Sequence, residues 1–234
     1  MKYHQFTRIF SAGNLSNKII ILSNLADIHY LVKVMRKRVA DQILLFNNKD
    51  GEFIVKIIEI KPKQITFEAI EQIRQPEPQE EINLIFAPIK QNRMMFLLEK
   101  ATELGVTILT PIQTSHSVVD KVNIDKWQIY IKEATEQCRR LSLPQIKPLA
   151  SLNSFLNTWP EDQLIYLCNE TEKSTNFGQI KKSLPINIMI GPEGGFSVQE
   201  LEILTAKKFI TSVHLGRNIL RSETAAITAI ALSL

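Results

Sequence analysis

The stretch that decides the fold runs Ile186-Asn-Ile-Met-Ile-Gly-Pro-Glu-Gly-Gly-Phe-Ser197. Its apolar first half, Ile186 to Ile190, predicts a strand buried on both faces. The three glycines that follow allow backbone conformations that a side chain forbids, and they let a ligand lie against the chain. Ser197 and Glu200 have the spacing of a helix-capping box. Strand, glycine turn and helix in this order are typical of an α/β sheet.

A second segment repeats this pattern and runs Val213-His-Leu-Gly-Arg-Asn-Ile-Leu-Arg-Ser-Glu-Thr-Ala-Ala226. It predicts a short strand ending at Leu215-Gly216, a loop, and a helix that begins at Ser222. Ends of strands are where open α/β sheets bind ligands. Each loop alone also fits an ordinary strand-to-helix turn, and the spacing matches neither G-x-G-x-x-G nor a P-loop. Two loops that interleave glycine with Glu or Arg favour a ligand site.

Length and composition suggest one or two domains in 234 residues, and the apolar fraction of 44% is enough for sizeable cores. We expect no membrane span, because no tract of about 18 apolar residues occurs. The first residues lack the apolar core of a signal peptide. Cys138, Cys168 and four scattered histidines have no zinc spacing, so no metal is expected. These features predict a reduced, cytoplasmic protein.

Basic residues are concentrated in the N-terminal third. Residues 1–75 hold twelve Lys/Arg against seven Asp/Glu, whereas the remaining residues hold sixteen against seventeen. This distribution fits a polyanionic partner that contacts the first third. It fits a solvated basic surface equally well.

The predicted order of strands and helices changes after an acidic stretch that contains two prolines, Pro76-Glu-Pro-Gln-Glu-Glu81. We interpret this stretch as a linker. Before it, short strands with turn residues between them predict a small barrel. A short helix over residues 27–36 with a basic end precedes those strands. After the linker, strands alternate with helices, which predicts parallel pairing.

The clearest helix is predicted over residues 124–143, with Pro144 ending it. Its polar stripe, Glu133, Gln137 and Arg140, fits a solvated face on its spacing alone.

Two quoted motifs carry a family resemblance: G191-P-E-G-G-F-S-x-x-E200 and L215-G-R-x-I-L-R-x-E-T-A225. They resemble the knotted SPOUT methyltransferases and, within them, the ribosomal RNA small subunit methyltransferase E family, over nearly the whole chain. The family tends to have Arg where His116 stands. The resemblance implies that the stripe Glu133, Gln137 and Arg140 faces the substrate cleft or a partner subunit. The resemblance implies an α/β fold with a PUA-like RNA-binding β-barrel in residues 1–73, a linker in 74–81, and a SPOUT domain with a C-terminal trefoil knot in 82–234.

The resemblance also implies an activity: methylation of N3 of a uridine in 16S-type small-subunit ribosomal RNA, with S-adenosylmethionine as cofactor and a homodimer as the working form. The implied cofactor-binding residues are Leu167, Asn169, Gly191, Pro192, Glu193, Gly194, Leu215, Gly216, Asn218, Ile219, Leu220 and Thr224. The implied RNA-binding residues are Arg8, His29, Lys33, Arg36, Lys90 and Arg93.

Methylation at N3 requires loss of the ring proton, so a general base or a cation near the resulting anion is needed. The predicted base is Glu223 or Glu193, and the predicted cation is Arg221 or Arg140. Glu223 also fits simple stabilisation of a helix N-terminus, and Glu193 fits a turn role. Two other functions stay open: a non-catalytic RNA-binding assembly factor, and an enzyme with a phosphate cofactor.

Overall fold

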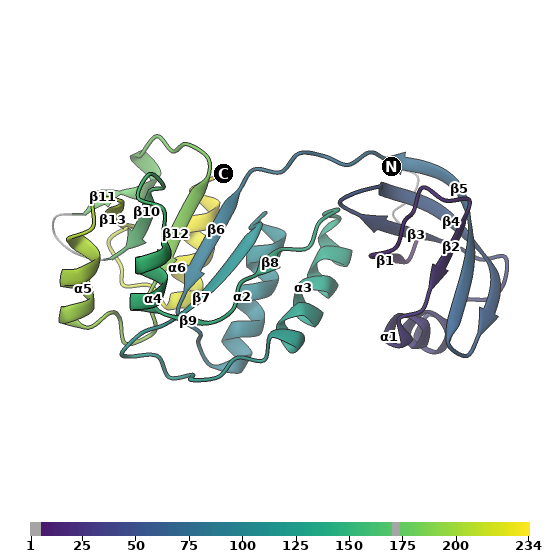
Figure 1. The fold of residues 1–234 in the computed structure, drawn as a ribbon, viewed down its shortest axis with the longest axis horizontal. Helices are drawn as coiled ribbons and strands as arrows, with labels where there is room; N and C mark the ends of the chain where they lie inside the picture. The colour runs from purple at the N-terminus through teal and green to yellow at the C-terminus, as the bar shows by residue number, and fades with distance from the viewer. Residues whose placement is uncertain (1–5, 170–173) are drawn as a thin grey trace. The chain divides into compact units, whose positions relative to one another are not determined.

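The computed structural model describes residues 6–169 and 174–234, and it divides into two compact units (Figure 1). Unit 1 contains the chain up to Pro78 and the segment Thr135–Leu143. Unit 2 contains Gln79–Ala134 and Pro144–Leu234. Contacts therefore group a short internal segment with the N-terminal part of the chain.

Unit 1 is built on a five-stranded sheet in the order β1-β3-β4-β5-β2. β1 pairs parallel with β3, and the other pairs are antiparallel. Alternate apolar side chains from the strands meet α1 and η1 in one core. The elements are β1 (Arg8–Phe10), β2 (Ile19–Leu22), α1 (Leu25–His29), η1 (Tyr30–Val34), β3 (Gln42–Asn47), β4 (Gly51–Lys61) and β5 (Gln64–Arg74).

The helix predicted over residues 27–36 begins earlier and changes type. Asn24 caps α1, because its side chain accepts a hydrogen bond from the backbone N–H of Asp27 at 3.1 Å. The helix then continues as the π-helical turn η1. Arg36 has a positive φ of 53°, a left-handed conformation that ends the helical path.

Arg8 holds the segment Thr135–Leu143 in unit 1. Its guanidinium is ion-paired with Glu52 and donates to the carbonyl oxygens of Thr135 at 2.8 Å and Arg140 at 2.6 Å. It also stacks on the ring of Phe46, 3.6 Å from the centroid. Burial lowers the pKa of Arg8, and the Glu52 carboxylate works against that shift.

Unit 2 is an α/β unit with an eight-stranded sheet, in the order β11-β13-β10-β12-β6-β7-β8, with β9 paired to β7. All of its strand pairs are parallel. The strands are β6 (Ile82–Phe86), β7 (Ile108–Gln113), β8 (Gln145–Ile146), β9 (Ala150–Ser151), β10 (Ile165–Cys168), β11 (Thr175–Asn176), β12 (Ile186–Ile190) and β13 (Ile210–His214).

Helices cover both faces of this sheet, which is why β6 and β12 are buried along their whole length (Figure 1). α4 and α5 share a core with the strands, and α2 packs against α6. The helical elements are α2 (Gln91–Glu103), α3 (Ile124–Cys138), α4 (Leu152–Thr158), η2 (Phe177–Gln179), α5 (Val198–Thr205) and α6 (Ser222–Ala231).

The long helix of the sequence analysis is shorter than predicted. α3 ends at Cys138 instead of residue 143, because Arg139 adopts a left-handed φ of 66°. Pro144 therefore follows an irregular segment and does not itself stop the helix. By contrast, Gly105 has a φ of +95° directly after α2, as expected of a C-cap glycine.

A buried polar row sets the register of the central strands. The Asn83 side chain donates to Asn187 at 3.3 Å and accepts from the Thr110 hydroxyl at 2.8 Å. The amide of Asn187 also donates to the carbonyl oxygen of Leu164 at 2.9 Å, next to β10. A slip of one residue would break this row, so it helps to align the strand ends.

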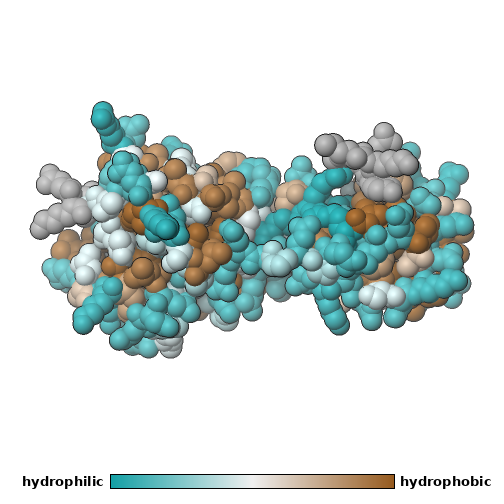
Figure 2. Space-filling model, turned by 90° about the horizontal axis from the view of Figure 1, so that it is seen from above, coloured by the Kyte–Doolittle hydropathy of each residue, from teal (hydrophilic) through white to brown (hydrophobic). Residues whose placement is uncertain are grey.

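Apolar side chains reach the surface in separate patches between hydrophilic residues on the face shown in Figure 2. On unit 2, Met95 and Phe96 of α2 are 42% and 44% exposed. Within residues 6–169 and 174–234, no helix has the length and apolar character needed to cross a membrane.

Candidate functional site

Three neighbouring parallel strands end at one cavity. β13, β10 and β12 lie side by side in the sheet and are parallel, so their carboxyl ends meet at one edge. The cavity has a volume of about 310 Å³. It is lined by Cys168, Asn169, Ile190, Gly191, Pro192, Glu193, Gly194, Gly195, Phe196, Val213, His214, Leu215, Ile219, Leu220, Ser222 and Ala225.

The glycine loop, residues 191–195, is shaped by close packing. A Cβ atom at Gly191 would lie 2.9 Å from the ring of Phe196, so this position leaves no room for a side chain. Gly195 has a φ of +69°, which L-residues with a side chain rarely adopt. The glycines therefore bring the backbone itself to the wall of the cavity.

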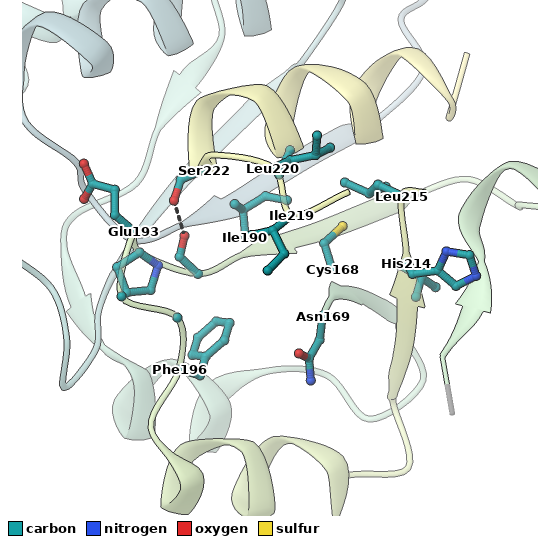
Figure 3. Close-up of a pocket in the computed structure, with 16 residues that line it drawn as sticks. Cys168, Asn169, Ile190, Glu193, Phe196, His214, Leu215, Ile219, Leu220 and Ser222 are labelled. Carbon is teal, nitrogen blue, oxygen red and sulfur yellow. Dashed lines mark hydrogen bonds between the residues drawn. The ribbon is translucent and has the colours of Figure 1, made fainter. Parts of the chain in front are cut away.

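Side chains from three other elements fix this loop. The Ser222 hydroxyl, at the start of α6, donates to the carbonyl oxygen of Gly191 at 3.0 Å (Figure 3). Nδ1 of His116 lies 3.2 and 3.1 Å from the carbonyl oxygens of Gly194 and Gly195. Because both partners are acceptors, Nδ1 must carry the proton.

Polar atoms without protein partners face this region. Asn169 Nδ2 and His214 Nδ1 are buried and have no hydrogen-bond partner among the described residues. Figure 3 shows Asn169 and Phe196 on one side of the cavity, with Ile219 and Leu220 across from them. Buried donors are normally satisfied, so the Asn169 amide is suited to a polar atom of a ligand.

Cys168 lies at the end of β10 in the cavity wall. Burial raises the pKa of its thiol to about 12. The thiol is therefore protonated at neutral pH, and a protonated thiol is a poor nucleophile. The cavity thus offers a neutral sulfur surface.

A charged cluster lies where the glycine loop meets α2 and α6. Arg93 of α2 donates from Nη1 to Glu193 at 3.3 Å, and its Nε lies 3.7 Å from Glu223. The side chain of Glu223 is only 10% exposed, and its Oε2 atom has no hydrogen-bond partner among the described residues. In Figure 3 the carboxylate of Glu193 points away from the other labelled side chains.

Most of the predicted cofactor residues line the cavity. Eight do so: Asn169, Gly191, Pro192, Glu193, Gly194, Leu215, Ile219 and Leu220. Leu167 instead packs into the core between the sheet and α4, while Gly216, Asn218 and Thr224 are exposed.

Part of the lining was not predicted, notably Cys168, Phe196, His214 and Ser222. Each is adjacent to a predicted loop, so proximity to a strand end was the available signal. In the segment after β10, Glu170 and Thr171 lie outside the described residues.

The predicted catalytic residues fall into two groups. Glu193 and Glu223 meet through Arg93, and Arg221 is an exposed residue at the N-cap of α6. Arg140 belongs to unit 1, where burial lowers the pKa of its guanidinium.

The predicted RNA-binding residues differ in accessibility. His29, Lys33, Arg36 and Lys90 are exposed. Arg8 is buried and bonded as described above, which favours a structural role. Arg93 is half-buried and paired with two carboxylates. Among the described residues, no group of three or more His, Cys, Asp or Glu side chains is arranged to hold a metal ion.

Two stretches of the chain match models of known protein families. Residues 75–234 match the family model described as an RNA methyltransferase domain, and residues 22–70 match the RNA methyltransferase PUA domain. A ribosomal RNA small subunit methyltransferase E from Rickettsia conorii is 39% identical over 236 residues, covering 99% of this chain and 95% of the relative. The chain belongs to the ribosomal RNA small subunit methyltransferase E family.

Solved structures of similar proteins agree with this membership of the methyltransferase E family. A methyltransferase from Legionella pneumophila, in complex with bound cofactor SAM, is 29% identical with a TM-score of 0.84. A ribosomal RNA small subunit methyltransferase E from Neisseria gonorrhoeae, bound to S-adenosyl methionine, is 26% identical with a TM-score of 0.84. Each comparison covers 97% of this chain and 96% of the other. The predicted α/β fold with an N-terminal PUA domain is confirmed.

Proposed function

We propose that this protein uses S-adenosylmethionine to methylate N3 of a uridine in small-subunit ribosomal RNA. The observation that carries the proposal is the cavity at the ends of β10, β12 and β13, in a chain of the methyltransferase E family. Two relatives, 39% and 31% identical to this chain, are named as ribosomal RNA small subunit methyltransferase E.

The residues of the cavity fit the proposed cofactor. About 310 Å³ lies within the size range of small-molecule sites. Gly191 has no room for a side chain beside Phe196, so its bare backbone forms part of the wall. Ile190 and Leu220 offer apolar contact, and the Asn169 amide is an unused donor. S-adenosylmethionine supplies an electrophilic methyl group on a positively charged sulfur.

The reacting nitrogen of uridine carries a proton at neutral pH, so this chain must provide a base. We propose Glu223, because its Oε2 atom is unused whereas Glu193 is hydrogen-bonded to Arg93. As N3 attacks the methyl carbon, its proton passes to the Glu223 carboxylate and the carbon–sulfur bond breaks. Arg221 or Arg140 would stabilise the negative charge on the uracil oxygens.

The proposal extends to the rest of the molecule. The exposed basic side chains of unit 1, including Lys33 and Arg36, would contact RNA phosphates. Exposed Met95 and Phe96 on α2 suit burial in a homodimer.

We further propose a barrel in residues 1–73, a linker in 74–81, and a domain with a trefoil knot in 82–234. The expected location is the cytoplasm, where ribosomal subunits are assembled.

The first test is methyl transfer from labelled S-adenosylmethionine to small ribosomal subunits that lack the modification, followed by mapping of the base. We expect one methylated uridine. RNA binding without transfer would indicate a non-catalytic assembly factor. Selective thermal stabilisation by NAD or ATP instead of S-adenosylmethionine would indicate a phosphate-cofactor enzyme.

Variants of the predicted catalytic residues test the chemistry. Glu223→Gln should bind cofactor normally and lose at least about 100-fold in turnover, the usual scale of general base catalysis. Arg221→Ala should also bind cofactor and lose turnover. Glu202→Gln, which neutralises an exposed carboxylate on α5, is the control and should react at the wild-type rate. Wild-type rates for Glu223→Gln and Arg221→Ala would remove both residues from the reaction.

A further inference from the structure

Arg93 stands outside the cavity but contacts two of the segments that form it. It lies in the first turn of α2 and donates to Glu193 in the glycine loop at 3.3 Å. On its other side, Nε lies 3.7 Å from Glu223 in the first turn of α6. Arg93 thereby joins three elements that are far apart in the sequence.

Arg93 supplies the positive charge of this cluster. Glu193 and Glu223 are both within ion-pairing distance of the one guanidinium, which leaves an excess of one negative charge. Glu223 is more than nine-tenths buried, and a buried carboxylate without a cation is costly. Loss of Arg93 would therefore leave both carboxylates without the cation that they share.

The geometry of a guanidinium suits this position. Its planar fork presents donors in fixed directions, so one side chain can serve two acceptors. Among the described residues, no other ion pair to Glu193 or Glu223 is seen. Because both partners of Arg93 are protein carboxylates, this side chain is poorly placed to serve as a free contact for an RNA phosphate.

We propose that Arg93 is a positioning residue for methyl transfer, an inference that rests on the proposed function. It holds Glu193, and with it the glycine loop, against the start of α6, where it also fixes Glu223. The Ser222 hydroxyl links the same loop and helix through the carbonyl oxygen of Gly191. Arg93 thus sets the position of the proposed base relative to the cavity and does not itself touch the reactants.

Steady-state kinetics separate positioning from RNA binding. Arg93→Gln should lower kcat by about tenfold or more, because small displacements of a catalytic group are costly, and should change the KM for ribosomal RNA less than about twofold. Arg93→Lys keeps a cation and should recover part of the loss. The control Lys208→Gln removes an exposed charge near α5 and should match the wild type. A raised KM for RNA with unchanged kcat would show that Arg93 contacts RNA and overturn the proposal.

Thermal unfolding tests the ionic link between Arg93 and its two carboxylate partners, and it requires no measurement of activity. Arg93→Gln should lower Tm, and adding Glu223→Gln should raise it again, since the second change removes one of the two unpaired carboxylates. Simple additivity of the two changes would overturn the proposal. An inactive wild type that shows this non-additive unfolding would count against the proposed function while supporting the ionic link, so the two failures are distinguishable.

Discussion

Cys168 shows how the position of one residue sets its chemistry. It lies at the end of β10, and burial raises the pKa of its thiol to about 12. At pH 8 the thiolate fraction is small, and the site has no cysteine nucleophile there. This fits direct transfer to a ring nitrogen, with a carboxylate as the base.

The rate of alkylation tests the raised pKa of the Cys168 thiol. At pH 8, iodoacetamide should modify Cys168 in the folded protein at least about 100-fold more slowly than in urea, since the reactive thiolate is scarce. The modified peptide is identified by mass spectrometry. Equal rates in both states would contradict the assigned pKa.

The same shift affects stability at alkaline pH. The folded pKa lies above the unfolded one, so the stabilising contribution is complete below about pH 9 and is lost as pH rises towards 12. Cys168→Ala should therefore lose stability less steeply than the wild type over that range, as measured by urea unfolding.

At the scale of elements, α5 was well predicted because its signals are local. Ser197 accepts a hydrogen bond from the N–H of Glu200, and Glu200 accepts one from the N–H of Ser197, so the capping box is present. Glu200 also accepts from the N–H of Ser115 at 2.7 Å, which ties the segment after β7 to the same helix. The sequence carries no local sign of that long-range bond.

Glu200 gives a prediction with a defined pH dependence. Burial alone would raise its pKa, but hydrogen bonds from Ser197 and Ser115 outweigh it and lower the pKa below the ordinary value. A depressed folded pKa means that stability is present above the unfolded pKa of about 4.5 and is lost as pH falls.

The test is Glu200→Ala, which should cost about 2 kcal/mol at pH 7, because hydrogen bonds to charged groups contribute on that scale. The cost should shrink towards pH 3, as the pH falls through the lowered pKa and the wild-type carboxylate takes up a proton. The control Glu202→Ala, an exposed residue of the same helix, should be close to neutral at both pH values. A cost independent of pH would contradict the role of the charge.

Other elements show why boundaries were harder to predict. Residues 139–143 continue the helical pattern of α3, yet Arg139 is left-handed and the segment after it is held in unit 1 by Arg8. These contacts join residues more than 120 positions apart. Tertiary contacts of this kind override local propensity and leave no periodic signal.

At the scale of the whole molecule, the two glycine-containing motifs predicted both the α/β sheet and the edge where the cavity lies. Strand ends and glycines are visible in a sequence, so eight of the sixteen lining residues were predicted. The Arg93 cluster was not predicted, because Arg93 lies in α2, Glu193 in the glycine loop and Glu223 in α6. Its partners emerge only when α2 packs beside α6.

The central claim is that the loops after β10, β12 and β13 together hold S-adenosylmethionine. The most direct measurement is a crystal structure of the protein grown with that cofactor. We predict its density between the glycine loop, Asn169 and residues 215–220, in contact with the backbone of Gly191. An empty cavity at saturating cofactor, or cofactor bound elsewhere on the chain, would contradict the account.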